Sequence, residues 1–276
     1  RVGLTQPGAS KALRELESTL QVDLFERTNR GLIPTEAGHC ALRFARLIQS
    51  DINQLRFELD AIASGVGGHL AIGTIMGAVP LLSDALSNVL ARQPHMSVEI
   101  IEDTSETLLG MIERGQIHAA ICRSSVSRTP EVYESLFIKQ ESLSVIASVR
   151  HPAMGAKAVQ LQDLQDSRWL VYRARMPMRR LLEREFHEAG LHFPSHLIET
   201  TSALATVTML GRNNDLVALV SDDIATYFSR NGLVGIIDLT LQSRSEPYEL
   251  VLRKGAPQSA ALGLLVEALC GGAAEA

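Results

Sequence analysis

The chain has 276 residues, a hydrophobic fraction of 46% and a formal net charge of −5. This length allows one large domain or two modest domains, each with its own core. No apolar run approaches the roughly 18–20 residues that a membrane-spanning helix needs, so we expect no membrane partner. The cysteines Cys40, Cys122 and Cys270 are isolated and lack the spacing of a zinc site, so they favour a reducing, cytoplasmic setting over a disulfide framework.

Charge is distributed unevenly along the chain. Residues 1–46 carry seven Lys or Arg and five Asp or Glu side chains, so this segment is slightly positive while the remainder is negative. A basic segment within an acidic protein is weak support for contact with nucleic acid. The sequence begins at Arg1 inside what its pattern indicates is a folded unit, so we expect further residues to precede it.

Residues 4–17 predict an amphipathic helix with a marked start. The Thr5 hydroxyl can accept a backbone N–H, and Pro7 lies in the first turn, where its missing N–H costs nothing. One face is apolar, with Ala9, Leu13, Leu16 and Leu20 at helical spacing. The more polar side carries groups that can pair with base edges in the major groove, namely Gln6, Ser10, Lys11 and Arg14. An ordinary helix with a solvated face would show the same periodicity, so this pattern alone leaves both interpretations open.

A short hairpin is predicted to follow this helix. The turn-forming sequence Asn29-Arg30-Gly31 is flanked by apolar residues on both sides. The hairpin would expose Arg27 and Arg30, and two arginines beside a groove-reading helix can contact the sugar-phosphate backbone and fix the register.

In their order and spacing, these motifs resemble the signature of LysR-type transcriptional regulators. The matching stretches are Thr5-Gln6-Pro7-Gly8-Ala9-Ser10-Lys11, Leu16-Glu17, Leu24-Phe25-Glu26-Arg27, Arg30-Gly31 and Pro34-Thr35-Glu36-Ala37-Gly38. The resemblance implies that residues 1–34 form the second half of a winged helix-turn-helix that binds double-stranded promoter DNA. It assigns DNA-facing positions to Gln6, Pro7, Ser10, Lys11, Arg27 and Arg30. Lys11 stands where the family more often has Arg, and Lys keeps the charge without the planar fork.

Residues 35–66 predict a long linker helix, because Thr35 can cap it and no proline interrupts it. Its apolar residues alternate in steps of four and three and form the narrow stripe Ile48, Ile52, Leu55, Leu59 and Ile62. Such a stripe suits a dimerisation helix, while a single helix packed on its own domain is the alternative. The LysR resemblance implies a homodimer or homotetramer, and paired heads suit paired DNA half-sites.

Residues 67–276 alternate strands with helices, which predicts parallel sheets covered on both faces. Strands are expected at 69–75, 97–102, 118–122, 143–148, 169–172, 197–200, 216–220, 235–239 and 248–253, and helices at 80–92, 105–113, 178–189, 202–211, 221–230 and 259–269. The resemblance implies an α/β effector domain with two lobes, like a type II periplasmic binding protein. Lobe 1 would comprise 67–140 and 245–276, lobe 2 would comprise 141–244, and the chain would cross near 139–142 and 240–246.

Ligand groups are expected where strands end and helices begin, in the cleft between the lobes. The candidates are Thr74, Met76, Gly77, Thr104, Ser105, Thr200, Thr201 and Ser202. Clustered hydroxyls and free backbone N–H groups suit an anion, although each hydroxyl could also serve only as a helix cap. The resemblance favours Ser105 and the Thr200–Ser202 cluster, and Gly77 stands where the family often has a hydroxyl residue. Arg175 and Arg179 could attract an acid, but a solvated pair is the simpler interpretation.

The sequence offers no catalytic set, so we expect a protein that is not an enzyme and needs no cofactor. His187, His192 and His196 lack the helical pairing of a zinc site and are expected at the surface without a metal. The leading hypothesis is a ligand-responsive DNA-binding regulator with a small-molecule effector, and the resemblance allows RNA polymerase as a partner. The alternatives are a solute-binding protein of the type II periplasmic class and an enzyme that uses the cleft.

Overall fold

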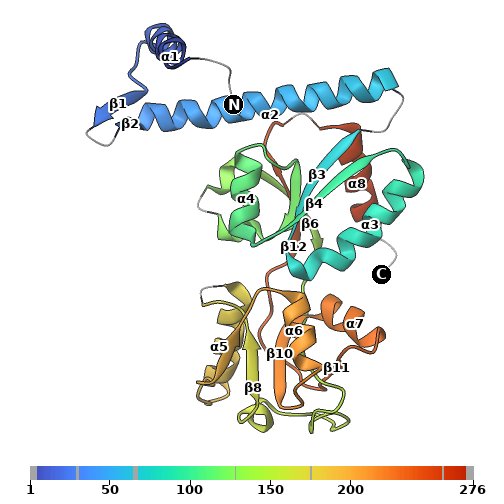
Figure 1. Ribbon diagram of the computed structural model, residues 1–276. Coiled ribbons are helices and arrows are strands. Elements are labelled where there is room, and N and C mark those ends of the chain that lie inside the picture. The colour runs from blue at the N-terminus through green and yellow to red at the C-terminus, as the bar shows by residue number, and fades with distance from the viewer. Residues whose placement is uncertain are drawn as a thin grey trace.

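The computed structural model describes residues 5–28, 31–64, 68–127, 129–174, 176–256 and 258–271. Figure 1 shows a small head, a long helix and two stacked lobes. The predicted hairpin tip at Arg30, and also Arg175, lie outside the described residues.

The head contains helix α1 (Gln6–Leu20) and the antiparallel hairpin of β1 (Phe25–Thr28) and β2 (Gly31–Pro34). The cap predicted at Thr5 is present, because its side chain accepts a hydrogen bond from the Gly8 backbone N–H at 3.4 Å. The helix is tied to the hairpin through Glu17, whose Oε1 accepts from the backbone N–H groups of Leu24 and Phe25. No residue of α1 is buried in the described structure: Leu16 and Leu20 are exposed and Leu13 is only partly buried, whereas the apolar side was expected to pack in a core.

Helix α2 (Glu36–Ser64) is the predicted linker and is about 43 Å long at 1.5 Å per residue. The Thr35 hydroxyl accepts from the Gly38 backbone N–H at 3.0 Å, as expected of a cap. Figure 1 shows α2 lying across the end of lobe 1 that faces away from lobe 2. Along the helix, large apolar side chains are exposed at Phe44, Ile48, Ile52, Leu55 and Leu59.

Lobe 1 is built on a five-stranded sheet in the order β4-β3-β5-β12-β6. The strands are β3 (His69–Thr74), β4 (Ser97–Glu102), β5 (Ala119–Cys122), β6 (Tyr133–Lys139) and β12 (Tyr248–Arg253). The sheet is mixed rather than wholly parallel: β3, β4 and β5 are parallel, whereas β12 pairs antiparallel with β5 and β6. Strand β6 was not predicted from the sequence, because its partner strand lies more than 100 residues further along the chain.

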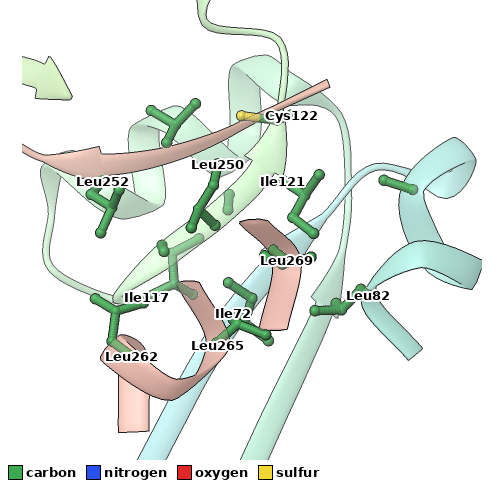
Figure 2. Packing of buried hydrophobic residues seen from close by; sticks show 14 of the residues in the cluster. Ile72, Leu82, Ile117, Ile121, Cys122, Leu250, Leu252, Leu262, Leu265 and Leu269 are labelled. Carbon is green, nitrogen blue, oxygen red and sulfur yellow. The ribbon is translucent and has the colours of Figure 1, made fainter. Parts of the chain in front are cut away.

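The helices of lobe 1 cover this sheet and close its core. They are α3 (Val79–Arg92), α4 (Ser105–Glu113) and α8 (Ala260–Gly271), with short 3-10 turns at Met76–Ala78, Ser124–Val126 and Pro130–Val132. Figure 2 shows Ile72 of β3, Ile121 of β5, Leu250 of β12 and Leu265 of α8 meeting in this core, and all four side chains are fully buried. Because β12 and α8 come from the end of the chain, lobe 1 is built from two segments that flank lobe 2 in the sequence.

Lobe 2 has a second five-stranded sheet in the order β11-β7-β10-β8-β9. The strands are β7 (Leu143–Ala147), β8 (Arg168–Val171), β9 (Leu197–Glu199), β10 (Leu216–Ser221) and β11 (Gly235–Ile236), and the helices are α5 (Pro177–Glu188), α6 (Ala203–Leu210) and α7 (Asp222–Arg230), with a 3-10 turn at Leu161–Leu164. Here β8, β9 and β10 are parallel, while β7 is antiparallel to β10, so this sheet is also mixed. The strand predicted at 235–239 is limited to two residues.

The helices of the described chain include none that is both long enough and apolar enough to cross a membrane.

Candidate functional site

A cleft of about 980 Å³ lies between the two lobes. Lobe 1 contributes the turn after β3 and the start of α4, and lobe 2 contributes the loop after β8 and much of α5. The two segments that cross between the lobes supply Glu141 from one side and Arg244, Ser245 and Glu246 from the other. Both lobes and both crossings therefore meet at this cleft, and a bound molecule would contact parts that can move relative to one another.

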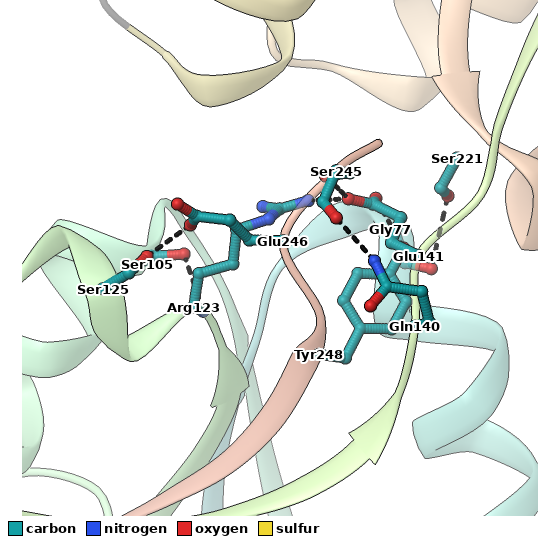
Figure 3. Close-up of polar contacts among 10 residues, drawn as sticks. All are labelled: Gly77, Ser105, Arg123, Ser125, Gln140, Glu141, Ser221, Ser245, Glu246 and Tyr248. Carbon is teal, nitrogen blue, oxygen red and sulfur yellow. Dashed lines mark hydrogen bonds and ion pairs between the residues drawn. The ribbon is translucent and has the colours of Figure 1, made fainter. Parts of the chain in front are cut away.

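Four residues form a buried polar group at the cleft floor, which we call the hinge cluster: Arg123, Glu141, Ser245 and Tyr248 (Figure 3). Glu141 is at its centre, because its carboxylate accepts hydrogen bonds from the Arg123 guanidinium, the Ser245 hydroxyl and, at 2.7 Å, the Tyr248 hydroxyl. The side chains of Arg123 and Glu141 are only 7% and 2% exposed. The hinge cluster thus holds both crossings on lobe 1.

Neighbouring contacts reinforce the hinge cluster. Gln140 of the first crossing donates to the Ser245 backbone carbonyl of the second at 2.6 Å. Burial, followed by the negative charge of Glu141, raises the pKa of Tyr248, so its hydroxyl stays protonated and can donate at neutral pH. Within the described structure, Nε of Arg123 is buried without a hydrogen-bond partner.

Charged side chains are segregated across the cleft. The wall from lobe 1 carries Glu102, Asp103 and Glu106, all exposed. The wall from lobe 2 carries the exposed arginines Arg173, Arg180 and Arg184, and the second crossing adds Arg244 together with the exposed Glu246. Positive charge at a cleft wall attracts an anionic ligand and raises its local concentration.

Five of the eight residues predicted to bind an effector line the cleft: Met76, Gly77, Thr104, Ser105 and Thr201. Thr104 also caps α4 by accepting from the Thr107 backbone N–H at 3.3 Å. Ser105 is largely buried, and its hydroxyl accepts from the Arg123 backbone N–H at 3.2 Å, which links the start of α4 to the hinge cluster.

Three of the predicted effector residues do not line the cleft. Thr74 is fully buried at the end of β3, where its hydroxyl donates to the Ile75 carbonyl at 3.1 Å. Thr200 lines a small depression that shares Met76, Tyr172 and Thr201 with the cleft, and its hydroxyl accepts from the Ser202 backbone N–H. Ser202 serves as the cap of α6, accepting from the Ala205 backbone N–H at 3.2 Å. In each of these residues, the hydroxyl group already forms a hydrogen bond to the backbone of its own segment.

The structure explains why residue 77 is a glycine. A Cβ atom there would lie 2.4 Å from the Tyr248 hydroxyl oxygen and 3.0 Å from Ser221 Oγ, so no side chain fits without displacing the hinge cluster. Because residue 77 is a glycine, any contact from this position to a ligand must come from the backbone.

On α5, the first arginine that lines the cleft is Arg180, one position after the predicted Arg179. Arg179 is buried rather than solvated, and its guanidinium pairs with Glu183 at 2.7 Å and Glu199 at 3.2 Å. Its neighbour Arg180 and, one turn later, Arg184 are the residues that line the cleft. Residues four apart share a helix face, so the presence of one on the cleft side predicts the other.

Other reactive groups do not form a second site in the described structure. Burial raises the pKa of the Cys122 thiol to about 12, so it stays protonated and unreactive near neutral pH. Among the described residues, no group of three or more His, Cys, Asp or Glu side chains is arranged to hold a metal ion.

The exposed surface of α1 gathers the predicted DNA-facing residues along one open groove of about 720 Å³. Its lining consists of Gln6, Pro7, Ser10, Lys11, Arg14, Glu15, Ser18 and Thr19. The side chain of Lys11 is 80% exposed, and its only described ion pair, with Glu15, is long at 3.8 Å. Arg27 is exposed on β1. These side chains are therefore accessible to a large partner.

Comparison with family models decides the identity. Residues 63–272 match the LysR substrate binding domain, and residues 1–39 match the bacterial regulatory helix-turn-helix protein model of the lysR family. The chain belongs to the LysR family. As a LysR-type protein it is a ligand-responsive transcriptional regulator, which confirms the predicted family, and nothing in these matches supports a periplasmic solute-binding role.

Curated relatives agree with this assignment. The LysR-type chain is 29% identical over 258 residues to the HTH-type transcriptional regulator GbpR of Azospirillum brasilense, covering 93% of this chain and 75% of that protein. It is also 29% identical over 264 residues to the HTH-type transcriptional regulator GalR of Pseudomonas putida, covering 94% of this chain but only 65% of that protein.

Solved structures share the fold at low sequence identity. The LysR family transcriptional regulator CbnR superposes with a TM-score of 0.61 at 23% identity, covering 98% of this chain and 92% of that one. The effector binding domain of QuiR in complex with shikimate gives a TM-score of 0.60 at 14% identity, covering 76% of this chain and 98% of that one. These likenesses confirm the fold.

Proposed function

We propose that this regulator reads double-stranded promoter DNA with the polar face of α1 and the hairpin beside it. The major groove would be faced by Gln6, Ser10, Lys11 and Arg14. Pro7, at the helix start, would lie close to the sugar-phosphate backbone of the DNA. Arg27 and Arg30 would contact the sugar-phosphate backbone on the hairpin side. The shared groove on α1 carries this proposal, because it presents these α1 side chains together and leaves them unburied.

The exposed apolar side chains of α2 support assembly. The stripe through Ile48, Ile52, Leu55 and Leu59 would be covered in a homodimer or homotetramer, which would pair two DNA-reading heads. We place this assembly in the cytoplasm, with its DNA. It would act by binding, without turning over its ligand, and would influence RNA polymerase at the promoter.

The effector is proposed to be a small anion held in the cleft between the lobes. The arginines on the wall from lobe 2 support an acidic ligand, with Ser105, Thr104 and Thr201 supplying hydrogen bonds and Met76 and Gly77 shaping the turn opposite. Thr74, Thr200 and Ser202 would support these residues rather than touch the ligand. Binding would favour one lobe arrangement over another, and the DNA-reading heads would follow that shift in population.

This proposal predicts a charge requirement that thermal shift can measure. Shikimate, benzoate and gluconate are probe acids, and their methyl esters are uncharged matches. At least one acid should raise the melting temperature of the full chain and its ester should not, because ligand binding to the folded state stabilises it by mass action. The double variant R180Q/R184Q should weaken that binding by about tenfold or more, equivalent to roughly 1.4 kcal/mol.

The matched control removes the same charge elsewhere on lobe 2. Arg212 and Arg230 are exposed and do not line the cleft, so R212Q/R230Q should bind the probe acid like the wild type. Equal stabilisation by acids and esters, stabilisation by none of the acids, or equal loss in both double variants would contradict an anionic effector at these arginines.

A further inference from the structure

The linker helix α2 rests on lobe 1 of its own chain through a small set of specific contacts. The Ser50 hydroxyl donates to the Gly115 carbonyl, and Asp51 accepts from the Arg253 guanidinium at 2.9 Å. Gly115 has φ +65°, and a Cβ atom there would lie 2.6 Å from Ser50 Cβ. The helix backbone is therefore seated directly against the loop that follows α4.

Gly115 and Arg253 each lie at the end of an element that begins at the cleft. Helix α4 starts with Thr104 and Ser105 in the cleft wall and reaches the Gly115 loop after nine residues, about 14 Å at 1.5 Å per residue. Strand β12 starts with Tyr248 in the hinge cluster and ends at Arg253, about 17 Å away at 3.4 Å per residue. Helix α4 and strand β12 therefore both connect the cleft to the contact with α2.

Both elements are held rigidly between those ends. Leu108 and Ile112 of α4, and Leu250 and Val251 of β12, are essentially excluded from solvent in the single core of lobe 1. A close-packed interior transmits displacement instead of absorbing it. A shift of α4 or β12 at the cleft would therefore reach the contact with α2.

We propose that Ser50 and Asp51 are positioning residues, through which the state of the cleft sets the position of the linker helix and hence of the DNA-reading head. This inference rests on the proposed effector role of the cleft. Ser50 lies on the face of α2 opposite the apolar stripe, whereas Asp51 lies beside the stripe, four residues before Leu55. Coupling of this kind is reciprocal, so disturbing the contact between α2 and lobe 1 must also change the structure or stability of the cleft.

The test is hydrogen exchange of the full chain without ligand or DNA. In G115A the new Cβ displaces α2, so amides of α2 near Ser50 and amides at the start of α4, residues 104–108, should both exchange at least about threefold faster. The control G232A introduces the same left-handed strain, φ +68°, where no atom lies within 4 Å of the added Cβ, and should change neither segment.

A second pair of variants separates coupling from local damage. S50A removes the hydroxyl that donates to Gly115, without a steric clash or a loss of helix propensity, and should speed exchange both in α2 and at residues 104–108. D51N weakens only the partly buried ionic contact with Arg253, introduces no steric clash, and should speed exchange in α2 and at the hinge-cluster end of β12. Changes confined to α2 and residues 113–117, with residues 104–108 and 248–249 unaltered, would overturn the inference. Because no ligand or DNA is used, that outcome differs from failure of the proposed effector or DNA sites.

Discussion

Replacing Glu141 with alanine is expected to lower the free energy of unfolding by about 3–5 kcal/mol, measured by chemical denaturation of the full chain. Its carboxylate accepts from Arg123, Ser245 and Tyr248, and its side chain is 2% exposed. Without it, the Arg123 guanidinium remains buried with its charge uncompensated, and two hydroxyl groups lose their acceptor. Leaving a buried charge unpaired is among the most costly single changes in a protein.

Two controls identify the buried charge as the cause. The double variant R123M/E141L replaces the pair with apolar side chains and should recover most of the lost stability, because no buried charge then remains. D223A removes the Asp223 partner of Lys139 in the same crossing, where the side chains are 24% and 50% exposed, and should cost only about 0–1 kcal/mol. A loss for E141A as small as that for D223A would contradict a buried, charge-compensated hinge.

Replacing Gln6 and Lys11 together with alanine is expected to reduce promoter occupancy about 100-fold. A well-placed side chain that reads a base edge contributes roughly 1–3 kcal/mol, and both residues line the same open surface of α1. Occupancy should be measured by chromatin immunoprecipitation of the native regulator in its host. Adding Arg30→Ala should lower it further through loss of a backbone contact.

The control K157A removes an exposed cation from lobe 2 and should leave promoter occupancy unchanged. Q6A and K11A are both at exposed positions, so the melting temperature should stay near that of the wild type. Normal promoter occupancy of the double variant, at normal protein levels, would show that α1 is not the DNA-reading helix.

The head and linker could be predicted well because their signals are local. Thr5 and Thr35 each precede a helix whose backbone they cap, and Gly31 follows a turn between two short strands. The sheets were predicted less well, since strand direction depends on partners distant in sequence. Strand β6 pairs only with β12, and a single sequence gives no sign of that pairing.

The site was predictable to the extent that it follows helix starts. Thr104 and Ser105 open α4 at the cleft as expected, whereas Thr200 and Ser202 have hydroxyl groups that are used locally. The hinge cluster was missed entirely, because Glu141 lies 18 residues from Arg123 and 107 from Tyr248. None of these residues is distinctive alone, and only the double crossing between the lobes brings them together.

The proposed function requires contact between the basic head and DNA phosphates. The salt dependence of DNA binding tests that contact directly. Gel-shift titrations of the native regulator on its promoter should give log affinity falling linearly with log salt concentration. With Arg27 and Arg30 neutralising phosphates from each of two heads, the expected slope is about −4, at roughly −0.9 per phosphate. A slope near zero, or no promoter binding at low salt, would contradict the account.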